Sequence, residues 1–216
     1  MTIHTPNFEG ARAYALERLA NELDPRLTYH HLGHTRDEVA AAVAVLANAL
    51  NVEGERLMLL RTAAYFHDLG YLHSRLEHEM HSVFICREAL PDFGYNVVQT
   101  EAIGTIIMAT RLPHRPKDVL GEILADADLD SLGSAAFLSR SADLRRELET
   151  FNSPISDAMW YQIQIDFMEA HHYFTAPAIA RNGAAKERHI ALMRALLNEA
   201  LEKDAAQKGA KEKEQS

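Results

Sequence analysis

Four residues of this chain carry side chains that commonly bind divalent metal ions: His34, the adjacent pair His67 and Asp68, and Asp128. Imidazole nitrogens and carboxylate oxygens are ligands that such ions take in proteins. The adjacent pair closes an apolar segment, LMLLRTAAYFHDLG, which otherwise has the composition of a buried helix. Because burying two ionisable groups is costly unless a partner offsets their desolvation, the sequence predicts a metal ion at this position.

The elements that carry these residues are predicted to be helices, since apolar residues recur at helical spacing almost throughout and strand-like alternation never lasts. His67 shares a face with Leu60 and Ala64 on a helix that follows Gly54, so its side chain is expected to point inward. Gly70 is expected to take the left-handed position that ends this helix. The predicted fold class is all-α.

Asp128 and His34 are also expected at defined places on helices. Asp128 follows Leu124 by four residues, which puts a carboxylate on the buried face of another predicted helix. His34 stands directly before Thr35-Arg-Asp-Glu38, a pattern typical of a capping box at a helix start. A second such pattern, Ser74-Arg-Leu-Glu77, is expected to open the helix that follows the one carrying His67.

Composition and charge limit the classes of partner. The 216 residues fit one domain, and 47% hydrophobic residues suffice for a core. A formal charge of −9 argues against a nucleic-acid polymer or an anionic membrane as partner, since both favour a basic face. A small phosphorylated ligand needs only a local cationic patch and remains compatible with this charge.

The expected location is the cytoplasm. The single cysteine, Cys86, is interpreted as a small buried hydrophobe, and with no second cysteine the chain can form no internal disulfide, which fits a reducing compartment. The segment MTIHTPNFEG lacks the apolar core of a secretory signal, and no run approaches the roughly 18 apolar residues of a membrane span.

One helical domain is predicted over residues 1–202, followed by a tail over residues 203–216. The tail, KDAAQKGAKEKEQS, is charged and lacks apolar anchors, a composition typical of disorder. The apolar helix before it could cover the bundle or pair with a second copy, so a homodimer is one expectation. His171, on the stripe of Trp160, is interpreted as a core histidine with satisfied hydrogen bonds.

The order of the four residues resembles the HD superfamily of metal-dependent phosphohydrolases. The stretches that carry the resemblance are TYHHLGHTRDEV, AAYFHDLGY and LADADLDSLG, within about residues 29–133. The resemblance implies a helical bundle of the HD type, here with additional C-terminal helices. It also implies that the metal ligands are His34, His67, Asp68 and Asp128.

The activity implied by the resemblance is hydrolysis of a phosphate ester, of a small nucleotide or related metabolite, by water activated on the metal. Relatives with two metals often have a histidine in the turn after the pair. Here the turn is Leu69-Gly-Tyr-Leu72, which favours one divalent ion, such as Mn²⁺, with Mg, Co, Ni, Fe or Zn as alternatives. Relatives that act on nucleoside monophosphates have a glutamate where this chain has Tyr71 and His73, which argues against that activity.

Candidate phosphate donors lie in two loops. Arg111, Arg115 and Lys117 cluster after one predicted helix, and Arg75 follows the His67-Asp68 pair closely. Guanidinium groups bind phosphate in a bidentate manner. The alternative interpretation is that these are solvated loop charges.

His78 and Glu79 are candidates for proton transfer or for supporting the metal ligands, and Asp68 or Asp128 is a candidate for orienting the attacking water. In His78-Glu-Met-His81 the histidines are spaced i, i+3, so the segment is not the zinc-protease motif, which needs i, i+4. The alternative interpretation is a helix start at which acidic residues are favoured by the helix dipole. His81 could act as an extra metal ligand.

Two other functions stay open at the level of sequence. Some HD-fold proteins are di-iron oxygenases, and the nearby candidates for the extra ligands would be His78, His81 and His114. The second alternative is a regulatory module that binds a nucleotide and has lost turnover. Such a module would show stabilisation by ligand without product.

Overall fold

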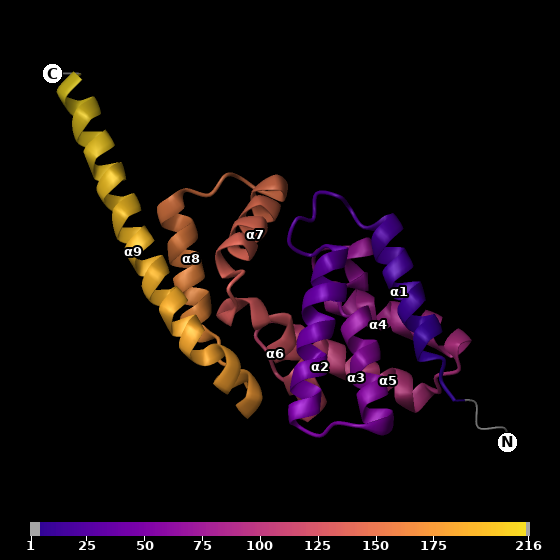
Figure 1. The fold of residues 1–216 in the computed structure, drawn as a ribbon. Coiled ribbons are helices and arrows are strands. Elements are labelled where there is room, and N and C mark those ends of the chain that lie inside the picture. Colours follow the sequence, from indigo (N-terminus) through magenta and orange to yellow (C-terminus); the bar gives the residue numbers. More distant parts are fainter. Residues whose placement is uncertain (1–4, 215–216) are drawn as a thin grey trace.

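The structure is a computed structural model that describes residues 5–214, and Figure 1 shows that it is built from helices. No strand occurs among these residues, so the predicted all-α fold class is confirmed. The α-helices are α1 (Phe8–Glu22), α2 (Ala40–Ala49), α3 (Gly54–Phe66), α4 (His78–Ala89), α5 (Val97–Ile107), α6 (Val119–Asp128), α7 (Phe137–Phe151), α8 (Asp157–Ala170) and α9 (Ala176–Glu214). A π-helical turn over His34–Val39 precedes α2, and 3-10 turns follow α3, α4, α5 and α6.

The larger of two hydrophobic cores joins α1 to α6. In Figure 1 helices α1 to α5 gather on one side, α7 to α9 lie on the other, and α6 lies between them. The apolar segment of α3 supplies Leu60 and Phe66, which are fully buried, and α5 supplies Ile103 and Ile107. Burial of each such side chain contributes on the order of 1.5–3 kcal/mol, so this core fixes the ends of α3 and α6.

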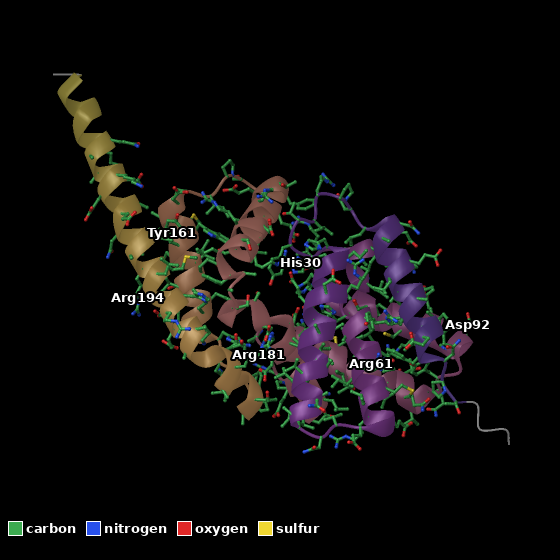
Figure 2. The ribbon with its side chains drawn as sticks, in the orientation of Figure 1. His30, Arg61, Asp92, Tyr161, Arg181 and Arg194 are labelled. Carbon is green, nitrogen blue, oxygen red and sulfur yellow. The ribbon has the colours of Figure 1, made fainter. Side chains whose placement is uncertain are left out.

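A smaller core joins α7, α8 and α9 through Phe137, Ile165, Met168, Ile190 and Met193. Helix α8 packs along α9. An ion pair of 2.6 Å between Glu169 of α8 and Arg194 of α9, labelled in Figure 2, also joins the two helices at the surface. This smaller core is the structural counterpart of the additional C-terminal helices expected from the sequence.

The buried carboxylate of Asp126 holds the segment before α9 against α6. It accepts hydrogen bonds from the backbone N–H groups of Phe174 and Thr175, both at 2.8 Å, and from the Thr175 hydroxyl at 2.7 Å. A fully buried carboxylate is stable only with such donors. The C-terminal helices are therefore anchored within the last turn of α6.

Neither predicted capping box is present. Thr35 is buried inside the π-helical turn and its hydroxyl has no hydrogen-bond partner in the described chain, while Glu38 contacts the His34 ring instead of the backbone. In the second pattern, Ser74 accepts a hydrogen bond from the Leu76 N–H, and Glu77 takes a left-handed conformation with φ of 53° directly before α4. In both segments the glutamate pairs with an arginine of another element instead of capping a helix: Glu38 lies 3.3 Å from Arg140, and Glu77 accepts from Arg111 at 2.7 Å.

Gly70 does not take the left-handed position that the sequence predicted. It lies inside the 3-10 turn Leu69–Leu72, and its N–H donates to the Ser82 hydroxyl at 2.7 Å. A Cβ at this position would collide with the backbone carbonyl of His78. The glycine is therefore required for the close approach of the turn to the start of α4.

The last helix is longer than expected. Helix α9 continues through Glu214, so residues 203–214 are helical where the sequence predicted a disordered tail, and residues 215–216 lie outside the described chain. Alanine, glutamate, lysine and glutamine dominate this stretch and have high helix propensity. Side chains from 201 to 208 are exposed. Among residues 5–214 every helix is too short or too polar to traverse a lipid bilayer.

Candidate metal centre

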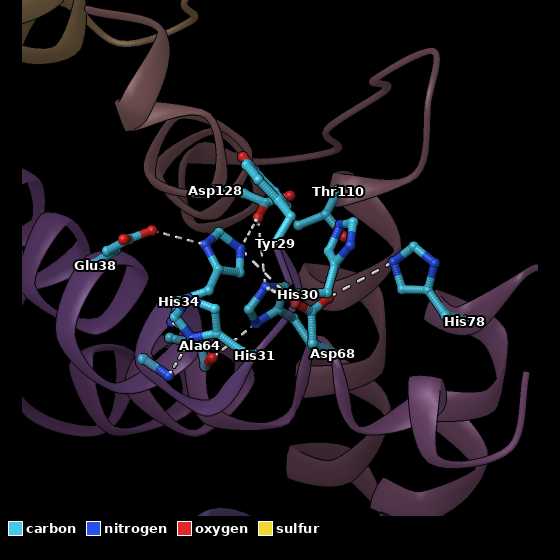
Figure 3. Close-up of polar contacts among 12 residues, drawn as sticks. Tyr29, His30, His31, His34, Glu38, Ala64, Asp68, His78, Thr110 and Asp128 are labelled. Carbon is cyan, nitrogen blue, oxygen red and sulfur yellow. Dashed lines mark hydrogen bonds and ion pairs between the residues drawn. The ribbon is translucent and has the colours of Figure 1, made fainter. Parts of the chain in front are cut away.

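Three separate elements bring the predicted ligands together, as Figure 3 shows. His34 begins the π-helical turn, His67 and Asp68 follow the last residue of α3, and Asp128 is the last residue of α6. Each ligand therefore sits at an element end, where the backbone turns and the side chain can leave the helix–helix packing. The imidazoles of His34 and His67 are buried, at 1% and 0% exposure.

The ligand atoms face one another. The Nε2 atoms of His34 and His67 lie 3.1 Å and 3.4 Å from Oδ1 of Asp128. The same two nitrogens lie 3.7 Å and 3.3 Å from Oδ2 of Asp68. One ligand atom from each of His34, His67 and Asp68 lies within 4.8 Å of the others, a spacing that a shared metal ion allows.

Two atoms of this cluster are buried without a hydrogen bond. They are Nε2 of His67 and Oδ2 of Asp68, neither of which has a partner of acceptable geometry among the described residues. A buried acceptor left unpaired costs about 1–3 kcal/mol, and more when it is charged. A lone pair on nitrogen and a carboxylate oxygen that both point into one space are a donor set suited to a divalent cation. The residues present therefore fit a metal ion.

The outer nitrogens of both imidazoles are held by neighbouring oxygens. Nδ1 of His67 donates to the backbone carbonyl of Ala64 at 2.9 Å, and Nδ1 of His34 lies 3.1 Å from Oε2 of Glu38. Such contacts keep a proton on Nδ1, so that Nε2 is the atom left to bind a metal once its own proton has been displaced. The Glu38 carboxylate also lies 3.3 Å from Nε of Arg140, a residue of α7.

Mutual attraction within the cluster shifts the pKa values of its members. Burial disfavours the charged carboxylates, yet the neighbouring imidazoles outweigh it and hold the pKa of Asp68 and of Asp128 below the usual range. Burial also lowers the pKa of His34, but contacts with Asp128 and Glu38 outweigh this effect and raise it to about 9. The carboxylates thus stay ionised, and a cation that binds must displace protons from the imidazoles.

A cavity of about 510 Å³ opens beside the cluster and is lined by Asp68 and Asp128. Arg75 and Arg111 also line it, which is where a phosphate-binding role requires them to be. The Arg111 guanidinium donates to Glu77 at 2.7 Å, and the Arg75 guanidinium lies over the Phe151 ring at 3.8 Å.

The other two predicted phosphate donors are placed elsewhere. Arg115 and Lys117 are exposed in the loop between α5 and α6 and do not line the cavity. The structure thus favours the alternative for these two, that they are solvated loop charges. Sequence proximity to Arg111 suggested one cluster, but the loop bends over residues 111–113, and Arg115 and Lys117 lie beyond this bend.

His78 and Glu79, the predicted proton-transfer groups, both line the cavity. Nε2 of His78 lies 3.7 Å from Oδ1 of Asp68 and 3.6 Å from Oε1 of Glu79. Burial lowers the pKa of His78 although both carboxylates act against this change. Figure 3 shows His78 on the side of Asp68 that faces away from His34.

The remaining histidines considered as ligands lie apart from the cluster. His81 packs near the rings of His73 and Phe84 and does not line the cavity. His114 lines the cavity but has the His171 ring as its neighbour, with centroids 6.2 Å apart.

A pair that the sequence did not indicate adds a further polar group to the cavity. Nδ1 of His30 lies 2.6 Å from Oε1 of Glu147, whose other oxygen accepts the backbone N–H groups of Tyr29 at 2.8 Å and His30 at 3.1 Å. Glu147 is buried on α7, and His30 lines the cavity. Figure 2 shows His30 between the α1–α5 helices and α7.

The separation of this pair explains why sequence reasoning missed it. His30 and Glu147 are 117 residues apart, and no local pattern connects them. The only signal was the position of His30 four residues before His34 in a histidine-rich segment.

Comparison with known proteins identifies part of the chain. Residues 32–131 match the family model described as HD domain. Neither the curated proteins nor the solved structures compared with the chain gave a match. The matched segment includes His34, His67, Asp68 and Asp128, whereas His30 and Glu147 lie outside it.

Proposed function

Because residues 32–131 of this chain form an HD domain, we propose that the protein is a metal-dependent phosphohydrolase that cleaves a phosphate ester with water. The observation that supports this most directly is the pair of unpartnered buried atoms, His67 Nε2 and Asp68 Oδ2, next to a cavity of substrate size. HD domains are metal-dependent hydrolases as a family, and the cluster has the donor atoms that such chemistry needs.

The metal-binding residues in this proposal are His34, His67, Asp68 and Asp128. A divalent ion held there supplies positive charge at the phosphoryl oxygens and a water of lowered pKa. The described residues contain one group of side chains close enough to share an ion, which favours a single metal over a di-iron centre. Two irons per chain with oxygen-dependent turnover would instead establish the oxygenase alternative.

The attacking water lies on the cavity side of Asp68 in this proposal. Asp68 orients the water, and His78, 3.7 Å from Oδ1 of Asp68, accepts its proton with Glu79 stabilising the charged imidazole. The oxygen of the water bonds to phosphorus as the phosphorus–oxygen bond to the leaving alcohol breaks.

His30 donates the proton that the leaving oxygen takes up. Glu147 positions the ring and stabilises its charged form through the 2.6 Å contact at Nδ1, an arrangement in which a carboxylate orients the general acid. The products are the alcohol and inorganic phosphate, so the proton given by His30 balances the one accepted by His78.

Arg75 and Arg111 bind the phosphate oxygens that face away from the metal. A guanidinium has five N–H donors, so Arg111 can hold Glu77 and a phosphate together. Arg115 and Lys117 have no part in this proposal. The sequence predicts a small nucleotide or related metabolite as the substrate, and the apolar residues that line the cavity favour a different organic group.

Metal content and activity test the proposal together. Purified protein is expected to hold close to one equivalent of metal by elemental analysis and to release phosphate from ester substrates in a screen with Mn²⁺, Mg²⁺, Co²⁺ and Ni²⁺. The double variant His67→Ala, Asp68→Ala should lose both metal and activity. The control variant His81→Ala, which alters a histidine outside the cavity, should keep both.

Three outcomes would contradict parts of the proposal. Metal retained unchanged in the double variant would mean that the site lies elsewhere. Thermal stabilisation by a nucleotide without any product, in metal-loaded protein, would establish the regulatory alternative. Turnover that is unaffected by chelation would exclude the metal-dependent reaction.

A further inference from the structure

One wall of the cavity comes from two helices outside the matched segment and is mostly apolar. Helix α7 contributes Phe137, Leu144 and Leu148, and helix α8 contributes Trp160, Ile163 and Phe167. These residues repeat at intervals of three, four and seven, so each helix turns one apolar stripe to the cavity. The wall and the carboxylates of the cluster line one continuous space of about 510 Å³.

Three polar side chains on this wall, Trp160, Ser141 and Gln164, are hydrogen-bonded to one another. The Trp160 indole N–H donates to the Ser141 hydroxyl at 3.2 Å, and that hydroxyl donates to the side-chain carbonyl of Gln164 at 3.2 Å. A sugar or nucleobase needs donors and acceptors that are free to pair, because its own polar groups would otherwise be buried unsatisfied. An alkyl or aryl group has no such requirement.

Two exposed apolar side chains lie among the charged residues that line the cavity. Leu76, in the loop before α4, and Leu112, in the loop after α5, both line the cavity although they are 81% and 56% exposed. Both leucines line the same cavity as the inner wall and are accessible to solvent, and exposed apolar side chains around a pocket mark binding sites.

Few cationic side chains lie near the cluster, and each already contacts another group of the protein. Arg111 pairs with Glu77, Arg75 stacks on Phe151, and Arg140 contacts Glu38 at 3.3 Å and donates to the Tyr29 carbonyl at 2.7 Å. The acidic groups Asp68, Glu77, Glu79 and Asp128 line the same space. This charge balance suits one phosphate group and disfavours a chain of several.

We propose that the cavity binds a phosphate monoester of an apolar alcohol, with the phosphate at the metal cluster and an alkyl or aryl group against α7 and α8. This inference rests on the proposed function for its phosphate end and on the described wall for its apolar end. The reaction is then the hydrolysis of such an ester by water to the free alcohol and inorganic phosphate.

Unreactive analogues separate binding from turnover. We would titrate the metal-loaded, full-length protein with n-alkylphosphonates from ethyl to octyl and follow the emission of Trp160, which is the single tryptophan of the chain. Each added methylene is expected to tighten binding by up to about fourfold, equivalent to about 0.8 kcal/mol for a buried CH₂. Equal affinities for ethyl- and octylphosphonate, or an emission that does not respond to either, would overturn the inference.

A matched pair of substitutions on α7 locates the effect. Leu144→Asn places an amide in the apolar wall and is expected to weaken octylphosphonate binding by about tenfold or more, with little effect on ethylphosphonate. Leu138→Asn makes the same change on the same helix, at a side chain that is 52% exposed and outside the cavity lining, and should weaken neither. Equal effects of the two variants would contradict the assignment of the wall.

Failure of this inference can be told apart from failure of the proposed function. Binding that depends on chain length, together with no hydrolysis of octyl phosphate, would overturn the hydrolytic proposal and support the apolar pocket. Faster hydrolysis of a nucleoside monophosphate than of octyl phosphate, unchanged in Leu144→Asn, would overturn the apolar pocket and support the hydrolytic proposal.

Discussion

The Oε1 atom of Glu147 lies 2.6 Å from Nδ1 of His30, so a buried carboxylate on α7 holds an imidazole that lines the cavity beside the metal cluster. In the proposed reaction this imidazole protonates the leaving oxygen. Glu147→Gln and His30→Gln should therefore lower kcat for an alkyl phosphate by roughly 100-fold or more.

Comparing two leaving groups distinguishes proton donation by His30 from a merely structural role of the pair. The p-nitrophenolate anion departs without a proton, so p-nitrophenyl phosphate should be hydrolysed by both variants at close to the wild-type rate. Glu149→Gln, at another ion-paired glutamate on α7, serves as the control and should affect neither ester. Equal losses for both esters would assign Glu147 a structural role only.

Glu38 is expected to strengthen metal binding without touching the metal. Its carboxylate lies 3.1 Å from Nδ1 of His34 and so orients the ring and raises its basicity. Glu38→Gln should weaken metal affinity by roughly 10–100-fold, measured by competition with a chelating dye. Asp37→Asn, one residue earlier and paired with Arg36 at the surface, should leave the affinity unchanged. An unaltered affinity in Glu38→Gln would show that the contact does not orient His34.

Gly70 should tolerate no side chain. Because a Cβ at Gly70 would meet the carbonyl of His78, Gly70→Ala must push the turn after the metal-binding pair away from α4. We expect the free energy of unfolding to fall by roughly 2–3 kcal/mol. Gly183→Ala, on α9, places its Cβ 3.9 Å from the nearest Ile179 atom and should instead stabilise by about 0.5–1 kcal/mol. Chemical denaturation measures both, and a neutral Gly70→Ala would contradict the packing described.

His171 should make stability depend on pH. Its ring is buried, and neither nitrogen has a hydrogen-bond partner within residues 5–214, contrary to the satisfied core histidine expected from the sequence. Burial, with the charge of Lys186, lowers the pKa of His171 from 6.5 to about 3. Between these values the unfolded chain binds a proton that the folded chain does not. The stabilisation is therefore complete above pH 6.5 and is lost as the pH falls towards 3.

Comparing His171→Leu with His172→Leu separates the titration of His171 from general acid denaturation. The wild type should lose up to roughly 1.4 kcal/mol per pH unit through His171 alone in this interval. His171→Leu should show a shallower slope, whereas His172→Leu, at the exposed neighbour, should follow the wild type. Parallel slopes for all three proteins would mean that His171 titrates normally.

The sequence allowed the fold class and the grouping of four ligand candidates to be predicted because both depend on local signals. Apolar residues at helical spacing indicated the helices, and the polar pair after the apolar segment of α3 indicated a buried site. The match over residues 32–131 confirms the resemblance on which the ligand set was based. The roles of the individual site residues stay predictions.

Contacts between distant elements explain why the other features of the site could not be predicted from the sequence. Glu38 was interpreted as a capping residue because the pattern from Thr35 fits one, yet the His34 ring and Arg140 compete for its carboxylate. Gly70 looked like a helix terminator because the close approach of α4 leaves no trace in the local sequence. Glu147 had no local signal at all, since its partner is contributed by the loop after α1.

The apolar wall and the metal ligands belong to different stretches of the chain, so substrate selectivity and reaction chemistry can diverge separately among related proteins. Residues 32–131 hold the candidate ligands, while the apolar cavity lining that we propose to bind the organic part of the substrate comes from helices α7 and α8. Substitutions at the apolar wall residues of the later stretch, such as Leu144, can change selectivity while the metal ligands stay as they are, whereas Glu147 of the same stretch holds His30. Proteins that share only the earlier stretch should therefore be compared by their chemistry, and their physiological substrates should be determined one by one.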